Sequence, residues 1–440
     1  MTELTTTDAA AIATNVVEMA RDGRFDDMEQ LFGAPLRAVV SAETMRVAWR
    51  TEIVSRGPVT TIGEPALTQG KGGLVRVRVN VFCERGALTV GMTIDGQGSL
   101  QGLALLAPEG APSWTPPAYA NPRKFEEQVV MVGPDELPVP GTLSLPHGHG
   151  KRPAVVLLPP MGPLDRDETS GPNKPLKDLA WGLASRGVAV LRFDMVTYAH
   201  RQQVATRRDF TMADEYIPYA AAAIHLLKLQ PTVDPAQVFI LGHSMGGKVA
   251  PRVAAAEPSI AGLVIMAGDT QPMQRSAVRV ARYLARLSPS PESEAAVETM
   301  ARQAALVDSP ELSSATPGSS LPFGLSGAYW LDLRSYDPVS TAAVLDKPMF
   351  ILQGGRDYQV TVEDDLPRWR EGLGQRPEVT IRVYDADNHL FFSGTGPSMP
   401  AEYNLAQHVD PAVVADIAAW LAPKRGMITR LFSPIMSHKQ

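Results

Sequence analysis

The sequence predicts an α/β protein: a doubly wound, mostly parallel sheet with a helical insertion, preceded by a small α+β domain. From residue 154 onward, short apolar runs rich in β-branched residues alternate with helix-compatible stretches. Such runs are typical of strands buried on both faces of a helix-covered sheet. Before that point, helical periodicity gives way to alternation of apolar and polar residues, which favours a separate α+β unit. The six predicted parallel strands are 154–158, 188–193, 238–241, 263–267, 349–352 and 379–384.

Composition excludes several classes of function for this chain of 440 residues. A hydrophobic content of 44% and a charged content of 20% describe an ordinary globular protein, and a net charge of −6 argues against nucleic-acid binding. No apolar run approaches the roughly 20 residues of a membrane helix. Cys83 is the single cysteine, which excludes disulfides within the chain and thiolate metal clusters. The first residues lack the pattern of a secretory signal, so we expect a cytoplasmic location.

Residues 1–107 are predicted to form the small α+β domain. Residues 7–56 have helical patterns, with one helix capped by Thr7, a second at 25–32 and a third after Ser41. Residues 74–82 alternate valine with arginine and asparagine, as on a strand with one solvent-exposed face. Further strands are expected at 87–95 and 98–106, and Cys83 is expected to be a small buried hydrophobic residue.

Residues 108–123 are predicted to be a linker, because five prolines there stiffen the chain and block regular pairing. A domain boundary belongs at this place, and the second domain is predicted to cover 124–440. It opens with two strands, at 127–132 and 141–145. His147 and His149 lie in the glycine-rich turn that follows, and without a carboxylate or cysteine at ligand spacing we expect a solvent-exposed loop there.

The segment Gly242-His243-Ser244-Met245-Gly246 follows the third predicted parallel strand and precedes a helix-compatible stretch. A serine on a sharp strand-to-helix turn needs small residues two before and two after it, where the backbones crowd. Such a turn exposes the serine oxygen and directs the first N–H groups of the helix toward the same point, where they can stabilise an oxyanion. Ser244 is therefore the predicted nucleophile.

A serine nucleophile needs a base and an acid that orients the base. His389 follows the last predicted strand and is the expected base, with His200 and His408 as alternatives in polar contexts. Asp357 directly follows the strand at 349–352 and is the expected acid. Asp269, after the preceding strand, is its rival, because some serine hydrolases take the acid from that position.

Residues 124–440 resemble the α/β-hydrolases, in particular bacterial serine esterases related to dienelactone hydrolases and to prolyl-oligopeptidase-clan catalytic domains. The segments that carry the resemblance are 162–169, 172–187, 242–247, 329–334, 352–360 and Asn388-His389. The order Ser, Asp, His is the one this fold implies. Known dienelactone hydrolases use a cysteine, whereas this chain has Ser244, so lactone specificity is not implied. Residues 1–107 resemble the cone-shaped nuclear-transport-factor-like domains that often precede bacterial hydrolases.

The second oxyanion donor is predicted on an unusual loop. Relatives usually have His-Gly after this strand, whereas here Pro159 and Pro160 remove two N–H donors. The expected oxyanion hole therefore consists of the N–H groups of Met245 and Met161, with Gly162 as the alternative to Met161.

About 80 residues separate the strand that ends near 267 from the one at 349, far more than one crossover helix requires. Helices are predicted at 277–287 and 292–306, before a Ser/Pro/Gly-rich stretch. Residues 270–330 are interpreted as a lid, the alternative being a decorated crossover without contact to substrate. Four aromatic residues are candidates to line an acyl pocket or to pack in the core: Tyr329, Trp330, Phe391 and Phe392. A C-terminal helix is predicted at 411–421.

The sequence therefore predicts a serine hydrolase that cleaves carboxylic esters through an acyl-enzyme, without metal or organic cofactor. The expected partner is a small acyl or ester substrate, with neither nucleic acid nor membrane, and self-association is left open. Alternatives within the fold are a peptidase, an amidase or an acyltransferase. An inactive binding protein is the alternative outside enzymes, and Pro159-Pro160 is the one feature in its favour.

Overall fold

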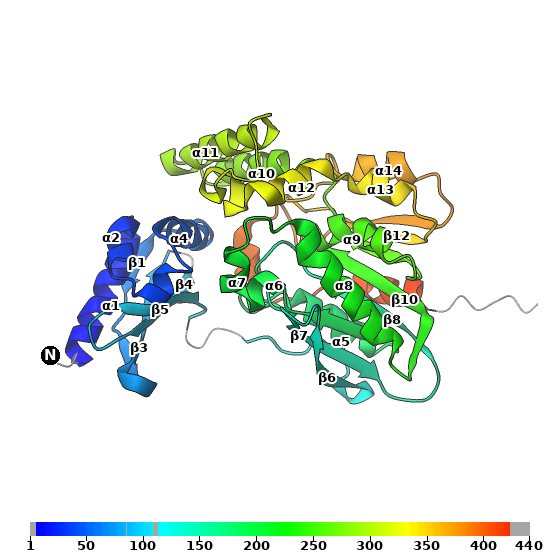
Figure 1. Ribbon diagram of the computed structural model, residues 1–440, viewed down its shortest axis with the longest axis horizontal. Coiled ribbons are helices and arrows are strands. Elements are labelled where there is room, and N and C mark those ends of the chain that lie inside the picture. The colour runs from blue at the N-terminus through cyan, green and yellow to red at the C-terminus, as the bar shows by residue number, and fades with distance from the viewer. Residues whose placement is uncertain (1–5, 85, 109–112, 423–440) are drawn as a thin grey trace, which may run out of the picture.

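The computed structural model describes residues 6–84, 86–108 and 113–422, which form two sheets with their helices (Figure 1). The first unit has the helices α1 (Thr6–Arg21), α2 (Phe25–Gln30), α3 (Ala34–Arg37) and α4 (Ala42–Arg56). Its strands are β1 (Val59–Ile62), β2 (Ala66–Gln69), β3 (Val75–Cys83), β4 (Gly86–Ile94) and β5 (Leu100–Leu106). The strand order is β1-β3-β4-β5, with β2 also paired to β3, and every pairing is antiparallel.

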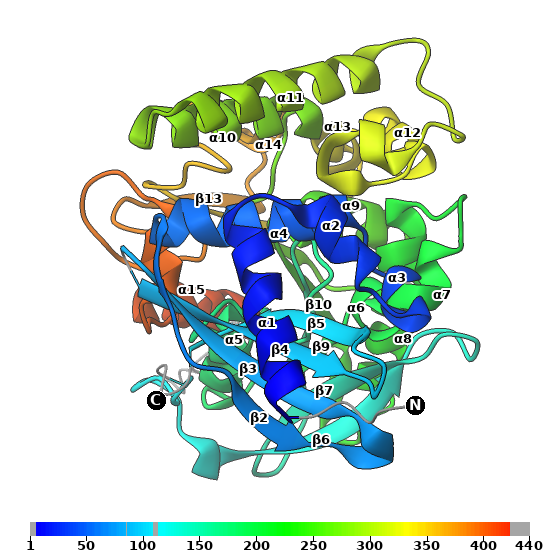
Figure 2. The ribbon, with the colours of Figure 1, turned by 90° about the vertical axis from the view of Figure 1, so that its left-hand side faces the viewer.

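Alternation along β3 builds the N-terminal core. Its valines face inward and are buried, whereas Arg76 and Arg78 are exposed. Helix α1 lies across the face of the sheet that carries these valines, and it contributes Val16 and Val17 to the same hydrophobic cluster (Figure 2). Cys83 is buried, and burial raises the pKa of its thiol. The helices and strands predicted for this part are confirmed, and the short elements α3, β1 and β2 are additional.

The second unit is built on an eight-stranded sheet in the order β13-β12-β11-β10-β8-β9-β7-β6. Strands β6 (Phe125–Val132) and β7 (Val139–Pro146) pair antiparallel at one edge. The remaining strands pair parallel: β8 (Arg152–Leu158), β9 (Ala189–Phe193), β10 (Val233–His243), β11 (Leu263–Met266), β12 (Met349–Gly354) and β13 (Val379–Tyr384). This confirms the predicted doubly wound, mostly parallel sheet.

Helices cover both faces of this sheet, so its central strands are buried on two sides. One hydrophobic cluster includes residues of α8 (Met212–Lys228), α9 (Met245–Ala256), α13 (Pro338–Ala343) and α14 (Leu366–Leu373). The cluster on the other face includes residues of α5 (Pro175–Ala184) and α15 (Pro411–Leu421). The short helices α6 (Val196–Ala199) and α7 (Arg201–Ala205) follow β9. None of the described helices is long and apolar enough to cross a membrane.

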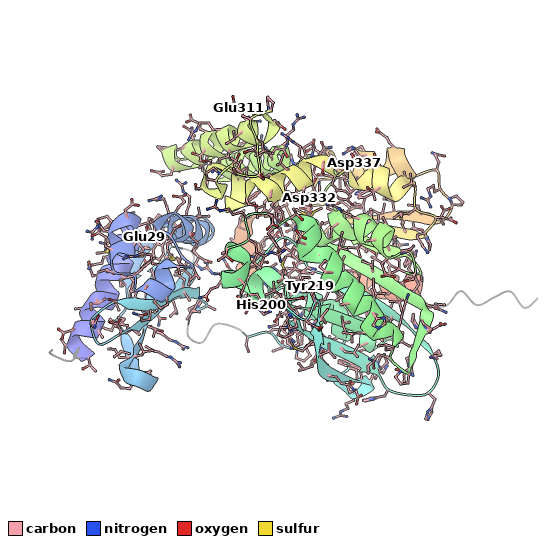
Figure 3. All side chains as sticks on the ribbon, viewed as in Figure 1. Glu29, His200, Tyr219, Glu311, Asp332 and Asp337 are labelled. Atoms are coloured by element: carbon pink, nitrogen blue, oxygen red, sulfur yellow. The ribbon has the colours of Figure 1, made fainter. Side chains whose placement is uncertain are left out.

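The insertion between β11 and β12 contains α10 (Met273–Leu287), α11 (Pro291–Asp308) and α12 (Gly327–Ser335), besides α13. Helices α10 and α11 pack against each other and, with α12, form one end of the molecule (Figures 1 and 2). Asp332 on α12 accepts hydrogen bonds from Arg252 on α9 and from the N–H of Ala213 on α8 (Figure 3). The two predicted helices are confirmed, beginning four residues and one residue earlier than expected.

Contacts of α4 and of the linker connect the N-terminal part to the larger unit. Helix α4 packs against the short helix η5 (Pro400–Asn404). In the described part of the predicted linker, Trp114 donates a hydrogen bond of 2.7 Å to Asp178 on α5 and packs edge-on against Trp181. The chain between the two sheets is therefore tied to α5 by an aromatic residue, although residues 109–112 lie outside the described part.

Candidate active site

Ser244 occupies a strained turn between β10 and α9. Its φ of 54° and ψ of −116° are values that residues other than glycine rarely adopt. A Cβ atom on Gly242 would lie 2.1 Å from the carbonyl oxygen of Gly246, and one on Gly246 would lie 2.4 Å from that of Leu158. The crowding predicted for the two flanking glycines is confirmed, and the backbone of this turn is held on several sides.

His389 and Asp357 meet at the carboxyl edge of the sheet. The Nδ1 atom of His389 lies 2.7 Å from Oδ2 of Asp357, and both side chains are buried. Asp357 also accepts hydrogen bonds from the N–H groups of Gln359 at 2.7 Å and Val360 at 3.0 Å. These hydrogen bonds hold the Asp357 carboxylate in place beside the imidazole of His389. With Nδ1 donating to Asp357, the other ring nitrogen of His389 is left as a proton acceptor.

The histidine loop is tied directly to the serine turn. His243, the residue before Ser244, has its Nε2 atom 2.8 Å from the carbonyl oxygen of His389. The amide oxygen of Asn388 accepts the N–H groups of Leu390 and Phe392, each at 3.1 Å. These bonds fix the backbone on both sides of His389, so the structure brings the predicted base and acid together beside the turn that carries the predicted nucleophile.

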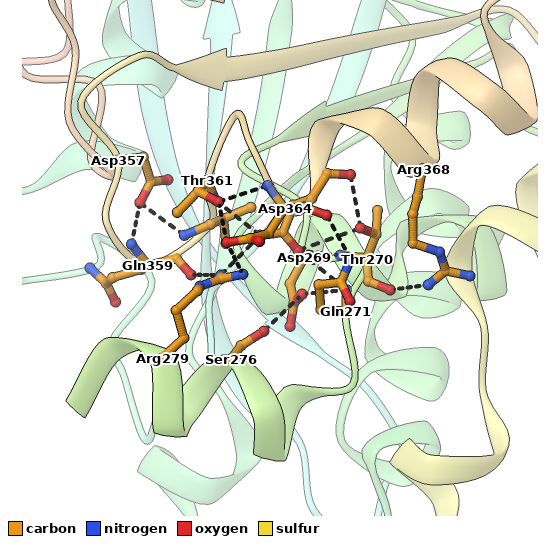
Figure 4. Close-up of polar contacts among 12 residues, drawn as sticks. Asp269, Thr270, Gln271, Ser276, Arg279, Asp357, Gln359, Thr361, Asp364 and Arg368 are labelled. Atoms are coloured by element: carbon orange, nitrogen blue, oxygen red, sulfur yellow. Dashed lines mark hydrogen bonds and ion pairs between the residues drawn. The ribbon is translucent and has the colours of Figure 1, made fainter. Parts of the chain in front are cut away.

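Asp269, the rival acid, is joined to Asp357 indirectly, through a polar network that includes Gln359, Arg279 and Asp365 (Figure 4). It accepts the N–H of Gln271 at 2.8 Å, and Lys248 Nζ lies 3.5 Å from its Oδ2. No histidine is among its hydrogen-bond or ion-pair partners in the described chain. Burial raises the pKa of Asp269 to about 7, against the opposing effect of Lys248. A carboxylate that is half protonated near neutral pH is poorly suited to orient a base.

The two alternative histidines have other partners. Nε2 of His200 lies 2.8 Å from the carbonyl oxygen of Pro138, near the junction of α6 and α7 (Figure 3). Nδ1 of His408 lies 3.1 Å from Asp178 on α5. Neither is joined to Asp357, which leaves His389 as the histidine that this acid orients.

The double-proline loop is held by one tyrosine. Tyr216 on α8 is buried, and its hydroxyl lies 3.1 Å from the carbonyl oxygens of both Pro159 and Pro160. Gly246 packs directly against the same loop, as its close approach to Leu158 indicates. Within the described part of the chain, the N–H groups of Met161, Gly162 and Met245 form no hydrogen bonds. These N–H groups are therefore available as donors, and the assignment of Met161 and Met245 to the oxyanion hole stays a prediction.

The four aromatic candidates for an acyl pocket are all buried. The Tyr329 hydroxyl donates to Glu215 at 2.6 Å, and the Trp330 indole donates to the carbonyl oxygen of Pro322 at 3.3 Å. Phe391 and Phe392 belong to the cluster on the α5 and α15 face. Core packing accounts for their burial, and contact with substrate stays a prediction.

Sequence reasoning missed two side chains that hold the site in place. Gln353 donates to Asp357 at 3.2 Å and to the carbonyl oxygen of Val360 at 2.6 Å, which closes the acid loop. Its signal is a polar residue inside the otherwise apolar run of β12. Tyr216 gives no comparable signal, because a tyrosine in an amphipathic helix is usually explained by packing alone.

The chain is similar to several known proteins. Residues 147–406 match the family model described as "Alpha/beta hydrolase family". The chain is 36% identical over 339 residues to esterase EstD of Thermotoga maritima, covering 77% of each protein. It is also similar to the solved structure of 2,6-dihydroxy-pseudo-oxynicotine hydrolase, with a TM-score of 0.44, 18% identity, 67% of this chain and 66% of that one. An esterase structure from Pyrococcus furiosus has a TM-score of 0.43 and 16% identity, covering 71% of this chain and 96% of that one.

Proposed function

Because this chain belongs to the alpha/beta hydrolase family, we propose that it is a carboxylic ester hydrolase with Ser244, His389 and Asp357 as its catalytic triad. The observation that carries the assignment of residues is the 2.7 Å contact between His389 and Asp357, on a loop bonded to the residue before Ser244. Esterase EstD, at 36% identity, supports an ester as the substrate class.

The reaction proceeds in two halves. His389 removes the proton of Ser244 through Nε2 while the serine oxygen attacks the ester carbonyl, and the N–H groups of Met245 and Met161 stabilise the oxyanion. The imidazolium, stabilised by Asp357, then gives its proton to the departing alcohol, which leaves an acyl ester on Ser244. Water attacks this acyl-enzyme with His389 again as base, and the carboxylic acid is released as the serine regains its proton.

The test is the substitution Ser244→Ala. We expect it to abolish hydrolysis of p-nitrophenyl butyrate and labelling by a fluorophosphonate probe, with a melting temperature close to that of the unsubstituted protein. Ser276→Ala, which removes a buried serine near Asp269, serves as the control and should retain both activities. Hydrolysis by Ser244→Ala at the unsubstituted rate would contradict the assignment.

The division of the chain is part of this proposal. Residues 1–107 would form an accessory domain, 108–123 a linker and 124–440 the hydrolase domain, with 270–330 acting as a lid over the site. The contacts of α10 with the loops after β12 and β13 support the lid. The single cysteine fits a cytoplasmic location, which we also propose.

A further inference from the structure

We infer that Glu168 and His243 form a second carboxylate–imidazole pair, which positions His389 through its backbone. This inference rests on the proposed function, because the position of His389 matters for turnover only if His389 acts as the base. Both are positioning residues, since neither is required to touch the substrate.

The pair lies directly behind the proposed triad. Nδ1 of His243 lies 3.0 Å from Oε1 of Glu168, and its other nitrogen contacts the carbonyl oxygen of His389 at 2.8 Å. The centres of the His243 and His389 rings are 4.9 Å apart. A continuous series of contacts therefore runs from Glu168 through His243 to the backbone of His389, beside the turn that holds Ser244.

Glu168 is buried in a conformation that its surroundings must impose. Its side chain is 4% exposed, and its φ of 57° lies in the left-handed region that favours glycine. Its neighbours anchor the loop: Arg166 forms a bidentate pair with Asp194, and Asp167 pairs with Arg192. With both neighbours paired elsewhere, Glu168 is the carboxylate of this loop that reaches the serine turn. A residue other than glycine keeps such a φ value only where surrounding contacts hold it there, and the contact with His243 is one of these contacts.

Glu168 makes the largest contribution among the groups that raise the pKa of His243. Burial alone disfavours the imidazolium, but the Glu168 carboxylate, the carbonyl oxygen of His389 and the more distant Asp357 together raise the pKa of His243. A protonated His243 carries N–H groups on both ring nitrogens, so one can face Glu168 while the other donates to His389. A neutral ring has only one N–H, so beside an ionised Glu168 the same two contacts could not both be favourable.

The hydrogen bond to the His389 carbonyl also restricts the orientation of the His389 imidazole. His389 must direct Nδ1 at Asp357 and Nε2 at Ser244 at the same time, and a rotation of the loop would misalign both. In the part of the chain that the structure describes, the charged or titratable groups that interact with His243 are Glu168, Asp357 and His389.

The substitution Glu168→Gln tests this arrangement, because it preserves side-chain size and removes the charge. We expect kcat for p-nitrophenyl butyrate to fall about 10–100-fold with KM changed by less than about threefold, as for a small misplacement of a catalytic group. An unchanged kcat would overturn the inference.

Asp178→Asn is the matched control. Asp178 is a buried carboxylate that also contacts an imidazole, that of His408, but none of its described hydrogen bonds or ion pairs is with His389 or His243. We expect this variant to lower the melting temperature without lowering kcat. Equal losses of kcat in both variants, in proportion to their losses of stability, would show a merely structural role for Glu168 and overturn the inference.

Histidine-selective ¹⁵N NMR of the unsubstituted protein decides the question even where Glu168→Gln fails to fold. The resonances of His243, identified by their absence in His243→Gln, should titrate at a pH above the ordinary pKa of histidine, 6.5. Titration below that value would overturn the inference. This measurement requires no turnover, so a failure of the Ser244→Ala test would count against the proposed function and leave the second pair to be judged by NMR.

Discussion

Two buried carboxylates, Asp357 and Asp269, follow neighbouring strands of the same sheet and have different polar neighbours. Asp357 accepts two backbone N–H groups and the Gln353 amide in addition to His389. Asp269 lies beside a second carboxylate, Asp365, which also accepts a hydrogen bond from the Gln271 N–H. Burial is the main cause that raises the pKa of Asp269, and the neighbouring Asp365 carboxylate adds to the rise.

The pKa of Asp269 leads to a prediction about stability and pH. Burial raises it to about 7, whereas the ordinary value is 3.8, so folding takes up a proton between these pH values. The stability that this group contributes is fully present below about pH 4 and is lost as pH rises through about 7. Asp269→Asn mimics the protonated form. We expect the melting temperature of the variant, relative to the unsubstituted protein, to rise between pH 5 and pH 8.

Scanning calorimetry at those two pH values measures this difference. Asp308→Asn, which changes a more exposed carboxylate that pairs with Arg275 and accepts the Gln274 amide, is the control and should give a nearly constant difference. A variant less stable relative to the unsubstituted protein at pH 8 than at pH 5 would mean that Asp269 is held charged by Lys248.

At the scale of elements, helix α10 connects the acid loop to the histidine loop. Arg279 donates at 2.7 Å to the carbonyl oxygen of Gln359, whose own N–H is bonded to Asp357 (Figure 4). Tyr283 stacks on Tyr358 with ring centres 5.0 Å apart, and its hydroxyl donates at 2.8 Å to the carbonyl oxygen of Ser398. One helix of the insertion therefore touches the segments that follow β12 and β13.

Tyr283→Phe should reveal whether this bridge affects catalysis. The stacked ring is retained and one hydrogen bond is lost, so we expect the free energy of unfolding to fall by about 1 kcal/mol. We further expect kcat for p-nitrophenyl butyrate to fall about 3–10-fold, because the histidine loop loses an anchor.

Tyr336→Phe is the matched control, since it removes a similar bond, to the carbonyl oxygen of Lys248 at 2.8 Å, away from both loops. It should lose about the same stability and keep its kcat. If both variants keep their kcat, α10 does not position the triad.

Sequence patterns predicted some of the elements and contacts of this structure and missed others. Apolar runs predicted the central parallel strands, because burial on both faces favours a nearly continuous apolar sequence. The edge strand β13 was also predicted, although its positions alternate between partly buried and exposed. The pairing of His389 with Asp357 was predictable because both follow strands whose carboxyl ends meet at one edge. The contact of Glu168 with His243 was not, since 75 positions separate them and neither lies in a periodic pattern. Strands β1 and β2 escaped prediction because they are four residues each and largely exposed.

At the scale of the whole molecule, the N-terminal part has a hydrophobic cluster of its own. Its members all lie between Ala9 and Leu100, and none belongs to the two clusters of the larger sheet. Its contact with the rest includes that of α4 with η5, where Glu402 accepts a hydrogen bond from Asn388, the residue before His389. Separate cores joined by a limited contact favour separate unfolding transitions.

Val79→Ala tests this independence. Val79 is fully buried on β3, so its truncation should destabilise the N-terminal part by about 1–3 kcal/mol. We expect calorimetry to show one transition moved to lower temperature and the other unchanged, with esterase activity at 25 °C retained. Val156→Ala, in the core of the larger sheet, should move the other transition. A single transition that moves as a whole in both variants would show one cooperative unit.

The bond from Tyr216 to the loop at Pro159 and Pro160 has a consequence for the temperature dependence of turnover. Two prolines with fixed φ and two held carbonyl groups leave this segment little disorder to lose when an acyl group arrives. Its ordering is completed once, during folding, and is not repeated in every catalytic cycle. The activation entropy of acylation should therefore be small, and the activation free energy of this step should be mainly enthalpic.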